Sequence, residues 1–266
     1  MSDRSTRAGD DFGAGAEPQS PSLLLSLLEI PRALSEASTL IPASVVLKRL
    51  PPGDGHAVMT LPGFLASGRS MRVVRNYLDT WGYDAHCWEL GRNLGVTQDR
   101  DVEALLDRRL REIHRRSGKR VSLVGWSLGG LLARELARRN PDLVRSVITL
   151  GSPIGSPRAT NVWRLYESVS GANIDSAAIQ ERVETLRDHI DGVSMTAVYS
   201  KTDAVVAAEI AQLPPGPQVQ NIGVPASHFG MGFNPAILYL IADRLRQHPR
   251  DWEPFEISGL RRVLFH

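Results

Sequence analysis

Apolar residues along the chain follow two different spacings in turn. Short apolar runs bounded by turn residues are typical of buried strands, whereas apolar positions three and four residues apart indicate one face of a helix. The runs predict strands at His56–Leu61, Tyr83–Leu90, Val121–Val124, Val144–Leu150, Val193–Ser200 and Val219–Gly223. The helical spacing predicts helices at Ser70–Trp81, Gln98–Ser117 and Pro235–Leu245, and one that carries Leu131, Leu132 and Leu136 and ends at Asn140. Strands that alternate with helices predict an α/β fold, with a mostly parallel sheet covered by helices on both faces.

This alternation occupies residues 55–247, which we predict to form one domain. Residues 1–21 are mostly polar and are expected to be a disordered tail. Residues 22–54 are expected to form a helical appendage followed by a turn-rich linker. Residues 248–266 are expected to be a C-terminal tail, and their pattern assigns them no role.

The appendage contains two apolar helix candidates, Leu23–Leu28 with Ile30 and then Ala33–Ile41. Pro31 and Pro42 follow them and lack the N–H that continues a helix, so two short helices are expected. These helices either pack against the main domain or form a membrane-surface or partner-binding element. The segment carries few Lys or Arg residues, which argues against attraction to anionic lipid.

Composition narrows the functional classes. A chain of 266 residues, 42% hydrophobic and 23% charged, is typical of one globular α/β domain with appendages. A net charge of +2 is too small to indicate a nucleic-acid partner. Cys87 is the only cysteine, so no intramolecular disulfide can form, and a cytoplasmic location is expected. The N-terminal residues do not have the pattern of a secretory signal, and no stretch reaches the roughly 18 apolar residues that a membrane helix needs.

The residue types and their spacing also indicate whether a metal or a cofactor is expected. The cysteine and the histidines do not follow the spacing of a zinc site, and no Gly-rich loop of the phosphate-binding kind occurs. We therefore expect neither a metal nor an organic cofactor. The sequence leaves the oligomeric state open.

Residues 121–130 carry the clearest candidate for chemistry. An apolar run leads into Gly125-Trp126-Ser127-Leu128-Gly129, and helical spacing follows at once. This order of strand, sharp turn and helix places Ser127 on a turn so tight that larger neighbours than glycine would clash. It also leaves the N–H of Leu128 at a helix N-terminus, where an oxyanion can bind. Ser127 is the expected nucleophile, and an ordinary Gly-rich turn is the alternative.

Residues 125–130 resemble the nucleophile elbow of the α/β-hydrolase fold, and residues 55–247 are similar to the esterase/lipase branch of that fold. The resemblance implies that the loop after an earlier strand supplies a second oxyanion amide. Pro62-Gly63-Phe64 follows the first strand, so the N–H of Phe64 is the expected donor, with Leu65 as the alternative if the register differs by one. Pro62 stands where enzymes with a His-Gly-Gly-Gly motif carry glycine, and this departure leaves the choice of donor open.

Two further residues complete a candidate catalytic triad. Ser127, Asp203 and His228 follow the chain order of nucleophile, acid and base in this fold, and each comes directly after a predicted strand. In open α/β sheets, functional residues gather at these carboxyl ends. Ser127 would attack an acyl carbon, His228 would accept and return its proton, and Asp203 would hold the imidazole in the required tautomer. Asp191 is also near a strand, but it precedes that strand and belongs at the opposite end of the sheet. His56, at the start of the first strand, is expected to be structural.

Residues 155–191 interrupt the alternation of strands and helices. At this place in the fold such an insertion is expected to form a helical cap over the active site, and the alternative is a surface helix pair that covers the sheet. Trp163, Leu165 and Tyr166 are the candidate substrate-binding residues of the insertion. They would line an apolar pocket in front of a helix that spans Ile179–Ile190.

Taken together, these features predict a serine hydrolase that cleaves carboxylic esters of small molecules or lipids through an acyl-enzyme. An acyltransferase or a thioesterase would use the same triad and differ only in the acceptor or the leaving group. A non-catalytic binding protein of the same fold is the third alternative. The choice among them depends on water access and pocket shape, which the sequence does not specify.

Overall fold

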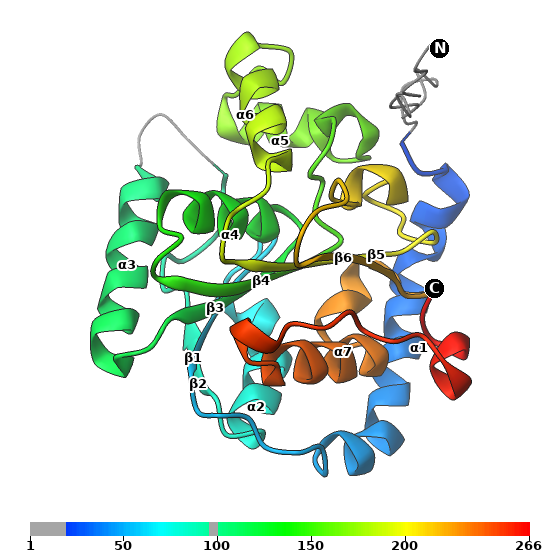
Figure 1. Ribbon diagram of the computed structural model, residues 1–266. Helices are drawn as coiled ribbons and strands as arrows, with labels where there is room; N and C mark the ends of the chain where they lie inside the picture. Colours follow the sequence, from blue (N-terminus) through cyan, green and yellow to red (C-terminus); the bar gives the residue numbers. More distant parts are fainter. Residues whose placement is uncertain (1–19, 96–100) are drawn as a thin grey trace, which may run out of the picture.

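The computed structural model describes residues 20–95 and 101–266, which form a six-stranded sheet with helices on both faces (Figure 1). The strands are β1 (Ala57–Leu61), β2 (Asp84–Cys87), β3 (Val121–Trp126), β4 (Val144–Leu150), β5 (Ser194–Tyr199) and β6 (Val219–Gly223). Their order across the sheet is β2-β1-β3-β4-β5-β6, and every neighbouring pair is parallel. The predicted α/β fold is confirmed.

Two apolar cores lie on the two faces of this sheet. The helices are α1 (Leu23–Leu47), α2 (Arg72–Thr80), α3 (Val102–Ser117), α4 (Leu128–Arg139), α5 (Trp163–Ser170), α6 (Ala177–Arg187) and α7 (Pro235–Arg246). Side chains of α1, α2 and α7 pack on one face, and those of α3 and α4 pack on the other. Successive strand residues point to opposite faces, so Val58 and Met59 of β1 contribute to different cores.

Local capping explains where two of the predicted helices begin. Asn234 caps α7 by accepting the N–H of Ala236 at 2.9 Å, and Pro235 occupies the first helical position. Asp101 caps α3 by accepting the N–H of Ala104 at 2.9 Å. The start predicted at Gln98 lies outside the described residues, as do residues 1–19 of the tail predicted for residues 1–21.

The N-terminal appendage is one helix instead of the two predicted. α1 continues through Pro31 and Pro42, both of which are exposed. Each proline withholds an N–H from the carbonyl four residues earlier, at Leu27 and Ser38, and these residues are exposed as well, so water can bind their carbonyls. The opposite face of α1 packs against α7 and the 3-10 turn Phe229–Gly232. The prediction that the prolines end the helix is therefore wrong.

The outer face of α1 is apolar. Leu24, Leu27, Leu34 and Ile41 are all exposed on it. Among the helices of the described residues, none combines the length and the apolar character needed to cross a membrane. Contact of residues 22–50 with a membrane surface stays an untested alternative.

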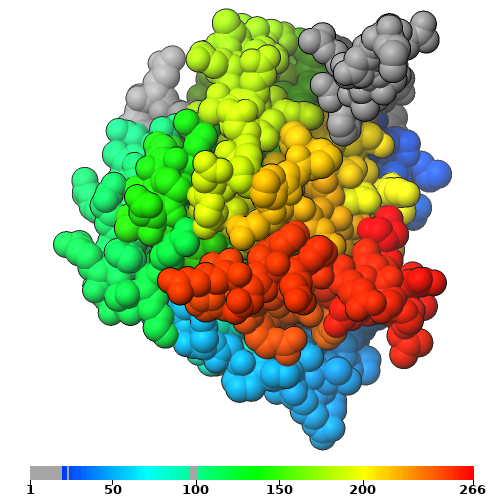
Figure 2. Space-filling model, in the orientation of Figure 1, coloured from blue at the N-terminus to red at the C-terminus, as the bar shows by residue number. Residues whose placement is uncertain are grey.

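The C-terminal tail packs on the same side of the sheet as α7. Phe255 and Phe265 are buried in the core on that face, and Arg244 of α7 lies over the ring of Phe255. The backbone of His266 exchanges two hydrogen bonds with Gly223 at the end of β6, at 2.7 and 3.0 Å. Figure 2 shows the tail as a red band across the surface of the molecule. It therefore covers part of a sheet edge that would otherwise expose unpaired backbone groups.

Candidate active site

Ser127 occupies a strained turn between β3 and α4. Its backbone has φ 53° and ψ −125°, a conformation that residues other than glycine rarely adopt. A Cβ on Gly125 would lie 2.4 Å from the carbonyl oxygen of Gly129, and a Cβ on Gly129 would lie 2.3 Å from that of Leu61. Both glycines are thus required by the close approach of α4 to β1 and β3. The turn is anchored to β4 because the N–H of Ser127 donates to the carbonyl of Leu150 at 2.8 Å.

Two backbone amides near Ser127 are the candidates for stabilising negative charge. Leu128 is the first residue of α4, so its N–H has no carbonyl of a preceding helical turn to bind. Gly63 lies against the serine, since a Cβ there would be 3.2 Å from the Cβ of Ser127. The N–H of Leu65 donates to the carbonyl of Asn93 at 2.7 Å and is therefore engaged. Of the two alternatives from the sequence, this geometry favours Phe64 as the second donor.

Asn93 holds the loop that carries Phe64. Its side-chain amide donates to the carbonyl of Pro62 at 2.7 Å, and its side-chain oxygen accepts the N–H of Gly95 at 3.1 Å. The side chain is buried, with 1% of the residue exposed. Asn93 could not be identified from the sequence, because an asparagine between two glycines signals a turn and carries no information about the loop that it contacts in space.

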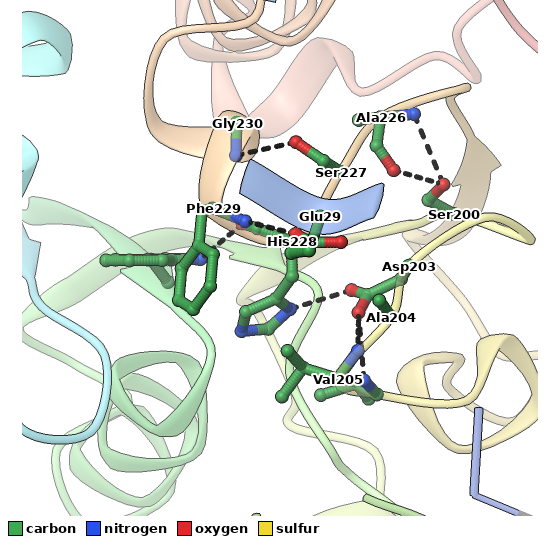
Figure 3. A network of polar contacts seen from close by, with 12 residues as sticks. Glu29, Ser200, Asp203, Ala204, Val205, Ala226, Ser227, His228, Phe229 and Gly230 are labelled. Atoms are coloured by element: carbon green, nitrogen blue, oxygen red, sulfur yellow. Dashed lines mark hydrogen bonds and ion pairs between the residues drawn. The ribbon is translucent and has the colours of Figure 1, made fainter. Parts of the chain in front are cut away.

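Asp203 and His228 form a buried pair beyond β5 and β6 (Figure 3). The Nδ1 atom of His228 lies 2.7 Å from Oδ2 of Asp203, and each residue is 3% exposed. The other carboxylate oxygen of Asp203 accepts the N–H groups of Val205 and Val206 at 2.7 and 2.9 Å. The carboxylate is therefore fixed from both sides, and Nε2 is the ring nitrogen of His228 left for proton exchange.

Trp126 connects this pair to the elbow. Its indole N–H donates to the carbonyl of His228 at 3.1 Å, and the two ring centroids are 5.8 Å apart. Because Trp126 directly precedes Ser127, the contact ties the loop of the histidine to the turn of the serine. In the sequence, Trp126 is recognisable only as part of the elbow motif, because its contact with His228 joins residues far apart in the chain.

An apolar cavity of about 100 Å³ lies beside Ser127. Phe64, Leu128 and Ser127 form one side of it, and the insertion between β4 and β5 forms the other. Insertion residues in the wall include Trp163, Tyr166, Ile174, Ile179, Val183 and Leu186. The insertion and Ser127 therefore line one cavity, which favours the cap over the surface helix pair.

The three residues proposed from sequence to line this pocket do not all face it. Trp163 and Tyr166 are in the wall, and the ring of Tyr166 meets that of Phe64 edge-on at 5.3 Å. Leu165 is 47% exposed and does not line the cavity. Positions 163 and 166 share one face of α5, whereas position 165 lies on another. The prediction that Leu165 lines this pocket is therefore wrong.

Arg182 brings a charge into the cavity wall, and acidic residues of the main domain neutralise it. Its guanidinium pairs with the carboxylate of Glu135 on α4 through two nitrogen atoms, and with Glu103 of α3 at 3.2 Å. Glu135 is buried, with 5% of the residue exposed. These ion pairs hold α6 against α3 and α4 of the main domain.

In the described part of the chain, no three His, Cys, Asp or Glu side chains are grouped as a metal ion would require.

A second Asp–His–Ser arrangement lies at the opposite end of the sheet. Nδ1 of His56 is 2.5 Å from Oδ1 of Asp54, and Nε2 is 2.8 Å from Oγ of Ser122. Arg145 also pairs with Asp54 at 2.6 Å. The imidazole of His56 is fully buried beneath the amino-terminal ends of the strands, where no substrate can reach it. The predicted structural role of His56 agrees with this position.

Burial of His56 predicts a pH-dependent stability. Burial lowers the pKa of His56 from 6.5 to about 4, although the hydrogen bond to Asp54 works in the opposite direction. Between these values the unfolded chain binds a proton that the folded chain does not. Protonation of His56 in the unfolded chain should therefore lower the free energy of unfolding by about 3 kcal/mol as the pH drops from 6.5 to 4.

Urea unfolding at pH 7, 5.5 and 4 measures this effect, with His56→Gln as the comparison. The variant should be less stable at pH 7 but should lose less stability on acidification, since all other titrating groups are shared. Equal losses in the two proteins would contradict the assignment to His56.

Solved structures of lipolytic enzymes have the same fold as this chain. One described with the metagenome-derived lipolytic enzymes LipS and LipT matches with a TM-score of 0.58 and 16% identity, over 74% of this chain and 96% of that chain. The mature lipase BlEst2 of Bacillus licheniformis matches with a TM-score of 0.55 and 18% identity, over 75% of this chain and 95% of that one. At these identities the likeness concerns the fold alone.

Two curated proteins are similar over part of the chain. The probable alcohol acetyltransferase of Cyberlindnera jadinii is 26% identical over 150 residues, which cover 54% of this chain and 39% of that protein. The pimeloyl-[acyl-carrier protein] methyl ester esterase of Vibrio atlanticus is 28% identical over 116 residues, which cover 43% of this chain and 38% of that protein. The matched segments thus span less than half the length of either relative.

A broader match concerns the family. Residues 38–262 match the profile of the Alpha/beta hydrolase family, and this range contains the whole sheet together with Ser127, Asp203 and His228. The chain therefore belongs to the alpha/beta hydrolase family.

Proposed function

We propose that this hydrolase cleaves carboxylic esters with apolar acyl groups, and that Ser127, His228 and Asp203 form its catalytic triad. The observation that carries the proposal is the 2.7 Å contact between His228 and Asp203, linked through Trp126 to a strained serine turn. The apolar cavity beside Ser127 supports an apolar acyl group as the bound part of the substrate. The similarity to a curated methyl ester esterase, 28% identical over 116 residues, supports the same reaction class.

In the first half of the reaction, Oγ of Ser127 attacks the acyl carbon while its proton passes to Nε2 of His228. The carbonyl electron pair moves to the oxygen, which the N–H groups of Leu128 and Phe64 bind. The intermediate collapses, the bond to the alcohol oxygen breaks, and the imidazolium returns its proton to the departing alcohol. Ser127 then carries the acyl group as an ester.

In the second half, water replaces the alcohol. His228 accepts a proton from water as the water oxygen attacks the acyl carbon, and the same amides hold the new oxyanion. Collapse breaks the bond to Oγ, and the imidazolium reprotonates Ser127. The products are a carboxylic acid and the regenerated enzyme. Asp203 keeps its contact with Nδ1 throughout and holds the imidazole in one tautomer.

The decisive experiment is labelling with a fluorophosphonate, which reacts with an activated serine. Ser127 should be labelled in the folded protein, together with turnover of short nitrophenyl esters. An unlabelled, folded protein would instead support the non-catalytic alternative.

Acyl transfer is the second candidate, because one relative is described as a probable alcohol acetyltransferase. It shares the acyl-enzyme and differs only in the acceptor. The ratio of acid to new ester formed in the presence of added alcohol distinguishes transfer from hydrolysis.

The apolar walls of the cavity predict a preference for longer acyl chains over acetate. Each buried CH₂ contributes roughly 0.8 kcal/mol, so two added carbons should raise kcat/KM by about tenfold until the cavity is full. Truncation of Trp163 or Tyr166 to alanine should flatten this dependence, since both side chains line the cavity. The measurement is kcat/KM for a series of nitrophenyl esters of increasing acyl length.

Leu165→Ala is the matched control, because Leu165 belongs to the same helix but faces solvent. Its profile should follow that of the wild type. If both Trp163→Ala and Tyr166→Ala keep the wild-type dependence on acyl length, the acyl group does not bind in this cavity.

A further inference from the structure

One face of α1 holds the loops that carry Asp203 and His228. Glu29 accepts the N–H of Phe229 at 2.8 Å, and Glu36 accepts the N–H of Ser227 at 2.6 Å, so both neighbours of His228 in the chain are bound by this helix. Arg32 donates to the hydroxyl of Thr202, next to Asp203, at 2.7 Å. The spacing of three and seven residues puts all three side chains on the same side of α1.

The two glutamates differ in their surroundings. Glu36 is bonded through both oxygens, because Oε2 accepts from the side-chain amide of Asn234 at 2.9 Å. Glu29 is 2% exposed, and its Oε2 atom is buried without a hydrogen-bond partner in the part of the chain that the structure describes. Figure 3 shows the Glu29 carboxyl beside the backbone of His228, with Asp203 close by. A buried carboxyl oxygen left unbonded next to a His–Asp pair calls for an explanation.

The charges around Glu29 come from three elements. Burial raises the pKa of Glu29, and the Phe229 amide lowers it. The negative charge of Asp203 raises this pKa further, whereas the protonated form of His228 and the positive charge of Arg32 lower it. The glutamate is therefore electrostatically coupled to both members of the pair, one on the loop after β5 and one on the loop after β6.

We propose that Glu29 is a positioning residue of the active site, which fixes the His228 loop through the Phe229 amide and adds a second carboxylate charge beside the His228–Asp203 pair. The inference rests on the proposed function, in which an imidazolium forms as Ser127 attacks. A carboxylate near the ring favours that charged form over neutral imidazole. Glu29 would thus assist proton transfer without contacting the substrate.

The first test follows the His228 imidazole by NMR across a pH titration, in the wild type, Glu29→Gln and Glu36→Gln. Glutamine keeps an oxygen for the Phe229 N–H and removes only the charge. The midpoint of the His228 titration should fall by about one pH unit in Glu29→Gln and stay at the wild-type value in Glu36→Gln. Because this readout needs no turnover, it holds whether or not an ester is hydrolysed. Equal midpoints in the wild type and Glu29→Gln would overturn the proposal.

The second test uses the pH dependence of ester hydrolysis. The acidic limb of kcat/KM should move to lower pH in Glu29→Gln, and kcat on the plateau should fall by up to about tenfold with KM unchanged. A purely structural role would lower thermal stability without moving the acidic limb, and that result would also refute the proposal. If the wild type hydrolyses esters and Glu29→Gln behaves in the same way, the role proposed for Glu29 is wrong and the proposed function still holds. If the wild type is inactive and is not labelled by the fluorophosphonate, the proposed function itself is wrong.

A third measurement avoids the variants in case Glu29→Gln does not fold. Carbon-13 NMR of the wild-type carboxyl groups should show Glu29 titrating above the ordinary range of glutamate, with a second inflection shared with His228. A single ordinary glutamate titration would contradict the coupling.

Discussion

Ser127→Ala is expected to lower kcat for ester hydrolysis by a factor on the order of 10⁶. The hydroxyl is the group that would carry the acyl chain, and His228 cannot activate water for the same attack with comparable geometry. Triad members act as a unit, so loss of the nucleophile removes most of the benefit of the other two. The measurement is single-turnover and steady-state hydrolysis of a nitrophenyl ester, with fluorophosphonate labelling in parallel.

Ser152→Ala is the matched control. Ser152 lies close to the elbow, where a Cβ on Gly130 would meet its Oγ atom, and this hydroxyl has no hydrogen-bond partner within the described residues. Its removal should leave turnover and labelling intact. If Ser127→Ala were folded and kept more than a few per cent of wild-type activity, another group would have to be the nucleophile.

Asp203→Asn is expected to lower kcat by about 10⁴. The oxygen that accepts the N–H groups of Val205 and Val206 must stay an oxygen, so the new amide nitrogen would face Nδ1 of His228. Nδ1 would then have to accept a hydrogen bond, and the ring proton would move to Nε2, which could no longer take the proton of Ser127. The variant should bind substrate with a KM near the wild-type value.

Asp191→Asn tests whether the acid has been assigned to the correct end of β5. The side chain of Asp191 is fully exposed before this strand, and it contacts His189 at 3.4 Å. Activity of this variant should stay close to the wild type. The reverse ranking of the two aspartate variants would show that the assignment of Asp203 as the acid is wrong.

Much of the sheet could be predicted from local pattern. The strands expected at Val144–Leu150 and Val219–Gly223 have the same bounds in the structure, and β3 extends two residues beyond the predicted run. Strands buried on both faces appear in sequence as continuous apolar runs, which makes them easy to detect. β2 is shorter than the predicted Tyr83–Leu90, since its last residues leave the sheet before the loop at Gly91.

The appendage could not be predicted in the same way. Proline alone indicates a helix end, but an exposed proline lets water satisfy the carbonyl that it leaves unpaired. The continuity of α1 depends instead on contacts with α7 and the turn Phe229–Gly232, which are distant in the chain. Its glutamates could not be connected to His228 from sequence, because Glu29 and Phe229 are 200 positions apart in the chain.

The α/β fold, the elbow around Ser127 and the order in which Asp203 and His228 follow it can all be inferred from the amino-acid sequence alone. These features depend on periodicity, on glycines needed for close backbone approach, and on the rule that parallel strands end at one edge. Three features become visible only in the folded chain. Leu65 is engaged by Asn93, Trp163 and Tyr166 but not Leu165 face the cavity, and Trp126 and Glu29 hold the His228 loop. Each of these depends on hydrogen bonds or packing between segments far apart in the chain, whose distances no local pattern encodes.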